Sequence, residues 1–196
     1  MPNQKVVTLL SGGIDSMVLA DSIHERKELE QLFLFVDYGQ RASMQEYKAA
    51  AAYAKGRGRL ERISISLRGL PLKSQLVTGR LRDPAFFPGR NLLLLMVAGW
   101  KACQLESDLI GIGLRDVPQF PDTSNSFVRA FEGASFMAFG RAFRVIAPLL
   151  QMGKGEVVQL GKRYGTPLSL SYSCYLGNKR PCGRCLGCDD RKGLDL

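Results

Sequence analysis

The sequence has no apolar run approaching the roughly 18 residues of a membrane-spanning helix, and its start, Met1 to Lys5, lacks the design of a signal peptide. These absences argue against a membrane or exported protein, so we expect a cytoplasmic location without membrane contact. The chain also contains no internal repeat and no low-complexity segment. The only histidine, His24, falls within a predicted helix far from any other motif, and we expect it on the surface.

Two common glycine-rich nucleotide motifs, G-x-x-x-x-G-K-[ST] and G-x-G-x-x-G, are missing as well. This excludes a Walker loop and a dinucleotide-binding fingerprint. Positive charge is plentiful, because 27 Lys and Arg against 18 Asp and Glu give a net charge of +9. A basic protein attracts polyanions such as nucleotides, pyrophosphate or nucleic acid. The positive residues are spread along the chain, so a basic surface around a nucleotide site fits at least as well as a nucleic-acid groove.

The 196 residues, 45% of them hydrophobic, suffice for one domain with a sizeable core. Strands are predicted at 5–10, 31–36, 62–66, 109–113 and 144–147, and helices at 16–26, 43–54, 126–139 and 156–164, with another opening at Asn91. Apolar strands that alternate with helices predict an α/β fold, with a parallel sheet covered on both faces. Ligands of such sheets bind at the carboxyl ends of the strands.

Two local predictions accompany this pattern. Residues 67–88, rich in glycine and proline, are predicted to form a long irregular connection. Ser43 followed by Glu46 is typical of a capping box at the start of a helix.

The most distinctive stretch is Ser11-Gly-Gly-Ile-Asp-Ser16, between a predicted strand and a predicted helix. Glycines let the backbone approach an anion closely, and the first N–H groups of the helix point at it. The S-G-G-x-D-S pattern is typical of the pyrophosphatase loop of adenylating enzymes, which cleave ATP between its α- and β-phosphates. The alternative is a plain Gly-Gly turn capped by Ser or Asp. The nucleotide interpretation assigns ATP binding to Leu10, Ser11, Gly12, Gly13, Ile14, Asp15 and Ser16.

Other polar stretches follow the predicted strands and converge on the same edge of the sheet. Asp37 to Arg41 is either a strand-ending turn or a frame for adenine with Arg41 reaching an anion. We include Val36, Asp37, Arg41 and Gly111 among the predicted ATP-binding residues. Arg90 precedes Asn91 at a predicted helix start, where Asn91 can cap the helix and Arg90 can bind an anion.

Four of the five cysteines cluster near the end of the chain, at Cys174, Cys182, Cys185 and Cys188. This spacing matches a closed tetrahedral zinc site, which is structural because it leaves no open position. A disulfide pair and a redox-active C-x-x-C are the alternatives, and a cytoplasmic location disfavours the disulfide. The fifth cysteine, Cys103, stands alone in an apolar helical pattern and is expected in the core.

Taken in order, these motifs resemble the 7-cyano-7-deazaguanine synthase family of the queuosine pathway. The resemblance covers nearly the whole chain and also includes Ala147-Pro-Leu149, Lys154, Glu156 and Ser173-Cys-Tyr175. It implies a Rossmann-like fold of the adenine nucleotide alpha hydrolase type, with an ATP-binding adenylation domain over 1–172 and a zinc-binding segment over 173–196. The implied reaction adenylates 7-carboxy-7-deazaguanine with ATP and Mg²⁺. Ammonia then displaces AMP to give an amide, and a second ATP drives formation of the nitrile.

The resemblance also implies roles for single residues. Catalysis is assigned to Asp15, Ser16, Lys154 and Arg90. Substrate binding is assigned to Tyr38, Gln40, Arg90, Asn91, Arg115, Asp116, Phe120 and Asp122. Lys154 at a helix start opposes the helix dipole, which favours a functional role over that of a surface lysine. Asp15 either orients Mg²⁺ or caps its helix.

The chain departs from the family pattern on the substrate side. Ala42 stands where members generally have histidine, and Gly113 to Thr123 differs from the usual Asn and Tyr-Pro-Asp-Cys run. A related ligase that passes the activated acid to an amine of a protein partner is therefore the first alternative. A basic zinc-knuckle module that binds or modifies tRNA is the second, although no aromatic stacking platform supports direct nucleic-acid binding. A homodimer, common among such relatives, is not specified by any stripe of residues.

Overall fold

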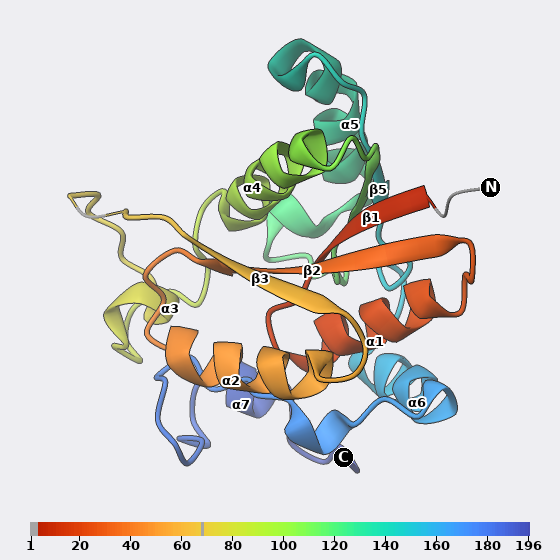
Figure 1. Ribbon diagram of the computed structural model, residues 1–196. Helices are drawn as coiled ribbons and strands as arrows, with labels where there is room; N and C mark the ends of the chain where they lie inside the picture. Colours follow the sequence, from red (N-terminus) through yellow and green to blue (C-terminus); the bar gives the residue numbers. More distant parts are fainter. Residues whose placement is uncertain (1–3, 68) are drawn as a thin grey trace.

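The computed structural model describes residues 4–67 and 69–196, and its centre is a parallel sheet with the strand order β3-β2-β1-β4-β5 (Figure 1). The strands are β1 (Gln4–Leu9), β2 (Leu29–Asp37), β3 (Arg59–Ser64), β4 (Leu109–Gly111) and β5 (Arg144–Ile146). Every neighbouring pair is parallel. The predicted α/β class is confirmed.

Helices cover both faces of this sheet. The long ones are α1 (Ile14–His24), α2 (Ser43–Ala54), α4 (Arg90–Gln104), α5 (Asn125–Phe139) and α6 (Lys154–Tyr164). Short turns of helix are α3 (Gln75–Thr78), α7 (Leu186–Asp189) and the 3₁₀ segments η1 (Pro121–Thr123) and η2 (Leu168–Leu170). Helices α4 and α5 lie on one side of the sheet, and α1, α2 and α6 lie on the other (Figure 1). Over the described ranges, no helix has both the length and the apolar content needed to cross a membrane.

Burial of the central strand explains why its sequence is apolar without alternation. Val6 and Val7 are both fully buried, although they point to opposite faces of the sheet. Val7 packs in the cluster under α4 and α5, whereas Val6 packs in the cluster under α1 and α6. A strand covered on both faces needs apolar residues at consecutive positions.

The strand order also places the functional edge of the sheet. β1 is paired with β2 on one side and with β4 on the other, and the chain leaves β1 directly into the 11–16 loop. Reversal of strand order beside β1 makes this the point where ligands bind in open parallel sheets.

Three local predictions are wrong. The N-cap of α2 is Ala42, and no side chain caps it, so Ser43 and Glu46 form no capping box. The N-cap of α4 is Gly89, and Asn91 lies inside the first turn instead of capping the helix. The 67–88 connection is not wholly irregular, because Ser74 caps the short helix α3 by accepting a hydrogen bond from the Leu76 N–H.

Candidate functional site

A cavity of about 230 Å³ opens at the carboxyl ends of β1, β2 and β4. It brings together segments far apart in the sequence, because the 11–16 loop, the ends of β2 and β4, the start of α4 and the C-terminal segment all line it. Predicted site residues along this cavity are Leu10, Ser11, Gly13, Ile14, Asp15, Ser16, Val36, Tyr38, Gln40, Arg90, Asn91 and Lys154.

The 11–16 loop has the geometry of an anion-binding turn. α1 begins at Ile14 after Gly13, so the first N–H groups of the helix lie beyond any acceptor of their own helix. The Ser16 hydroxyl donates to the Gly13 carbonyl at 2.9 Å, and the Ser11 hydroxyl donates to the Ser16 hydroxyl at 3.2 Å. Gly12 has φ +79°, and a Cβ there would stand 2.3 Å from the Glu46 carbonyl oxygen of α2. Only glycine fits this position, because the turn presses directly against α2.

Two carboxylates and two cations form a closed group beside this loop. Lys154 Nζ lies 2.8 Å from Asp15 Oδ1 and 3.1 Å from Asp190 Oδ2. Arg115 donates to Asp15 Oδ2 at 3.2 Å and to both oxygens of Asp190, at 2.8 and 3.1 Å. Burial works against the charged form of Arg115, but Asp15 and Asp190 outweigh it and raise its pKa.

This group excludes one of the two alternatives left open for each of Asp15 and Lys154. The side chain of Asp15 caps no helix N–H, since α1 has no side-chain cap, and its carboxylate is engaged with cations. Lys154 is not a surface lysine, because only 14% of its side chain is exposed. Both side chains line the cavity next to the 11–16 loop.

We expect Arg115→Ala to lower the melting temperature by about 5 °C, because it leaves two carboxylates sharing one lysine. Arg115 is 16% exposed and Asp15 is 24% exposed, so the loss falls between that of surface and fully buried ion pairs. Arg141→Ala is the matched control, since Arg141 and its partner Asp108 are 34% and 50% exposed. Thermal unfolding followed by circular dichroism measures both, and equal losses would contradict a stabilising role for the Arg115 contacts.

The opposite side of the cavity is built by the turn after β2. Gln40 accepts a hydrogen bond from the Tyr38 N–H at 2.9 Å and donates to the Val36 carbonyl at 3.2 Å, which fixes the turn. Its amide also donates to Glu46 Oε2 at 3.0 Å. Burial raises the pKa of Glu46 to about 7, against the hydrogen bond from Gln40 and the charge of Arg90.

The predicted substrate residues around α4 form a connected group. The Asn91 N–H donates to Asp122 Oδ2 at 3.0 Å, and the Asn91 amide donates to the Asp122 carbonyl at 2.9 Å. Phe120 stacks on Phe86, with ring centroids 5.7 Å apart. Arg90, Phe120 and Asp122 line a smaller side cavity, which shares Arg90 with the main one.

Some predicted residues lie outside the lining of the main cavity: Gly12, Asp37, Arg41, Gly111, Arg115, Asp116, Phe120 and Asp122. Asp37 is paired with Arg62 of β3. Arg41 is exposed and packs against Gly79, and Asp116 is also exposed. Gly111 packs against Ile23 of α1, because a Cβ there would lie 2.8 Å from Ile23 Cδ1.

Sequence reasoning missed several residues that do line the cavity: Glu46, Leu76, Gly113, Tyr172, Ser173, Tyr175, Gly187 and Asp190. For Gly113 the signal was available, because it lies two residues after the end of β4, and a Cβ there would lie 2.9 Å from the Asp15 carbonyl. Ser173 and Tyr175 belong to a motif of the family resemblance, whereas Tyr172, Gly187 and Asp190 carried no local signal. The segment reaches the site by tertiary packing, including a 2.9 Å hydrogen bond from the Tyr172 N–H to the Gly12 carbonyl.

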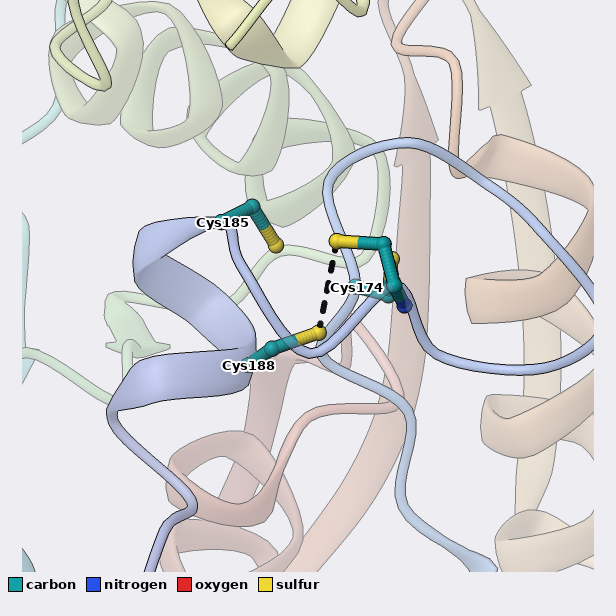
Figure 2. A group of neighbouring side chains, drawn as sticks. Cys174, Cys185 and Cys188 are labelled. Atoms are coloured by element: carbon teal, nitrogen blue, oxygen red, sulfur yellow. Dashed lines mark hydrogen bonds between the residues drawn. The ribbon is translucent and has the colours of Figure 1, made fainter.

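The four C-terminal cysteines form a cluster that could hold a metal, with all four Sγ atoms within 4.8 Å of one another. Figure 2 shows Cys185 at the start of α7 and Cys188 within it, with Cys174 behind them. The Sγ atoms of Cys182 and Cys188 are 3.8 Å apart, which matches the edge of about 3.8 Å in a tetrahedron with Zn–S bonds of about 2.3 Å.

Backbone donors surround these sulfur atoms. The Cys182 N–H donates to Cys174 Sγ at 3.3 Å, and the Tyr175 N–H donates to Cys185 Sγ at 3.4 Å. N–H donors stabilise thiolates, which is the protonation state that binds metal. All four thiols are free, so the disulfide alternative is not realised.

Comparisons with known proteins agree with this geometry. The sequence profile of the family described as "Queuosine biosynthesis protein QueC" matches residues 5–194. A 7-cyano-7-deazaguanine synthase from Nitrosococcus oceani is 34% identical over 212 residues, covering 98% of this chain and 93% of the relative. One from Methanosarcina mazei is 30% identical over 209 residues, covering 94% and 90%.

One solved structure supports the fold alone. The U34-tRNA thiolase NcsA from Methanococcus maripaludis, determined with its 4Fe-4S cluster, gives a TM-score of 0.57 at 15% identity. The match covers 85% of this chain and 59% of the thiolase chain.

Proposed function

The chain belongs to the QueC family of queuosine biosynthesis proteins, and from this premise we propose that it converts 7-carboxy-7-deazaguanine to 7-cyano-7-deazaguanine with ATP and ammonia. The observation that carries the proposal is the 11–16 loop at the carboxyl end of β1, with Lys154 and Asp15 beside it in one cavity. This arrangement suits an enzyme that cleaves ATP between the α- and β-phosphates.

The first step joins the substrate carboxylate to the α-phosphorus of ATP and releases pyrophosphate. Negative charge moves onto the leaving pyrophosphate, so the site must offer donors there. The N–H groups at the start of α1 and the Ser11 and Ser16 hydroxyls supply hydrogen bonds, and Lys154 supplies a cation. Arg90, which lines both cavities, would bind the substrate carboxylate.

Mg²⁺ fits the same region, because the Asp15 and Asp190 carboxylates that line the cavity are the oxygen ligands it prefers. When bound with ATP, it neutralises phosphate charge. Asp15 and Asp190 would hold it, while Lys154 and Arg115 keep their carboxylates oriented.

The later steps need exclusion of water more than they need a side-chain nucleophile. Ammonia attacks the acyl-adenylate and AMP leaves, which gives the amide. A second ATP then adenylates the amide oxygen, and loss of AMP with two protons from nitrogen gives the nitrile. Water would hydrolyse the first adenylate, so the C-terminal segment that contributes Tyr172 and Tyr175 to the cavity would shield it.

We further propose that the cysteine cluster binds Zn²⁺ and that residues 173–196 act as a zinc-binding segment packed on the adenylation domain. The closed set of four sulfur ligands gives this metal a structural role. The same C-terminal stretch contacts the 11–16 loop through the Tyr172 N–H and pairs with Lys154 through Asp190. By fixing this stretch, the metal would stabilise the site without contacting the substrates.

The test is a reaction with ATP, 7-carboxy-7-deazaguanine and ammonium, in which AMP release and product mass are followed. We expect AMP, pyrophosphate and a product with the mass of the nitrile. Absence of nitrile, with AMP release only after a protein amine is added, would support instead a ligase that passes the activated acid to a protein partner. Salt-sensitive tRNA affinity without turnover of the acid would contradict both.

A further inference from the structure

Glu46 is a half-buried carboxyl group that the adenylation chemistry leaves without a role. It projects from the first turn of α2 and lines the main cavity. Oε2 accepts a hydrogen bond from Gln40 at 3.0 Å. Among residues 4–67 and 69–196, no Lys, Arg or His nitrogen lies within 4 Å of either Glu46 carboxylate oxygen. Lys154, Asp15 and Asp190 line the same cavity, but Lys154 pairs with the two aspartates and not with Glu46. Oε1 therefore remains available to a ligand.

The surroundings hold this carboxyl group in one orientation. Gln40 is fixed by its own bonds to the Tyr38 N–H and the Val36 carbonyl, so the amide that donates to Glu46 cannot turn away. Tyr38, Leu76, Leu94 and Tyr175 give this cavity an apolar and aromatic lining, and Arg90 lines it as a charged group that acts electrostatically on Glu46. An oriented acceptor between flat aromatic and aliphatic side chains is suited to a planar heterocycle with N–H donors at its edge.

Burying a carboxylate beside one neutral amide is unfavourable for the free protein. The cost is offset if a ligand brings two adjacent donors, since an ionised carboxylate accepts hydrogen bonds at both oxygens. A ring N–H next to an exocyclic amino group is such a pair, and a guanine-type ring presents it. An adenine-type ring presents one amino group beside an acceptor nitrogen, which would repel the second oxygen.

We propose that Glu46 is a specificity-determining residue that accepts hydrogen bonds from the ring N–H and the 2-amino group of the deazaguanine acid. This inference rests on the proposed function, whose substrate carries that edge. Gln40 acts as a positioning residue, because it reaches the substrate only through Glu46. Glu46 would thus select the substrate ring while the 11–16 loop binds ATP.

The charge of Glu46 gives the recognition a dependence on pH. Burial raises its pKa to about 7, so the free protein loses the carboxylate, and with it one acceptor, as the pH falls through 7. The titratable and charged groups that face it come from the end of β2, from α4 and from the C-terminal segment: Asp37, Tyr38, Arg90, Tyr172 and Tyr175. Substrate affinity is therefore expected to weaken below about pH 7.

The experiment measures binding of 7-carboxy-7-deazaguanine, and of its analogue without the 2-amino group, to the full chain by calorimetry at pH 8 and pH 6. We expect the wild type to bind the analogue about 10- to 100-fold more weakly at pH 8, the range for hydrogen bonds to a charged group. Glu46→Gln should weaken binding of the acid by a similar factor and discriminate less than about 3-fold. Glu28→Gln, the same change at an exposed position, should match the wild type.

The outcomes separate this inference from the proposed function. If the wild type binds the acid but Glu46→Gln retains full discrimination, Glu46 has no recognition role and the proposed function stands. If Glu46→Gln loses affinity for a non-hydrolysable ATP analogue, Glu46 serves adenine and the inference is wrong. If the wild type binds no acid, both fail. The wild-type measurements test the inference even if the variant does not fold. They must show that the wild type binds the acid more tightly than the analogue at pH 8 and that this difference becomes smaller at pH 6.

Discussion

Cys182→Ser is expected to lower the melting temperature by more than about 10 °C and to abolish ATP binding. The Cys182 thiol lies 3.8 Å from Cys188 Sγ, and a serine hydroxyl is both shorter and a poorer ligand for zinc. Because metal binding is coupled to folding, losing one ligand releases the segment that it organises. The Tyr172 N–H of that segment donates to the Gly12 carbonyl, and its Asp190 pairs with Lys154, so the 11–16 loop loses these contacts.

The measurement combines metal analysis of the purified chain, thermal unfolding and ATP binding. Removal of metal from the wild type with a chelator should reproduce the variant. Cys103→Ser is the matched control, since Cys103 lies outside the cluster and packs at the edge of the α4 core. It should keep one zinc per chain and melt within a few degrees of the wild type. A Cys182→Ser protein with normal metal content and melting would contradict the structural role of the site.

Lys154→Gln is expected to reduce kcat for AMP formation by about 100- to 1000-fold, the usual loss when one preorganised group at a developing charge is removed. Lys154 is the lysine among the described residues that lines the cavity beside the 11–16 loop. Glutamine preserves much of its length and its ability to donate, but removes the charge. Folding should be affected little, because Arg115 still bridges Asp15 and Asp190.

Single-turnover formation of AMP and exchange of labelled pyrophosphate into ATP measure this effect on the adenylation step. Lys162→Gln, on the same helix, is the control, because Lys162 pairs with the 95% exposed Asp195 and neither residue lines the cavity. It should leave both rates within about 2-fold. Comparable losses in the two variants would show that Lys154 acts only through the stability of α6.

The fold was predictable because the signals that specify it are local. Consecutive buried residues such as Val6 and Val7 require apolar runs, and each run was followed by a helix. The cysteine spacing likewise predicted a cluster that the structure assembles. In both cases a short segment is constrained by its own periodicity or turn geometry, without reference to the rest of the chain.

The rest of the site depends on contacts between distant segments. Glu46 fitted the local pattern of a capping box, but tertiary packing turns its side chain toward Gln40 and the cavity. Arg115 and Asp190 are 75 residues apart, and no local sequence pattern predicts their ion pair. Arg41 followed the expected motif, yet its side chain turns outward against Gly79. Sequence patterns thus located the loops of the site, while the packing of the C-terminal segment determined which side chains face inward.

The hydrogen bond from the Tyr172 N–H to the Gly12 carbonyl joins residues separated by most of the chain. During synthesis, the sheet and the 11–16 loop leave the ribosome long before Tyr172 and Asp190 exist as chain. The nascent protein can form its core early, but the cavity is complete only after Tyr172, Tyr175 and Asp190, which line it, have been synthesised. Competence of the site therefore awaits synthesis of the segment from Tyr172 to Asp190, and the proposed Zn²⁺ would add the supply of metal as a second requirement.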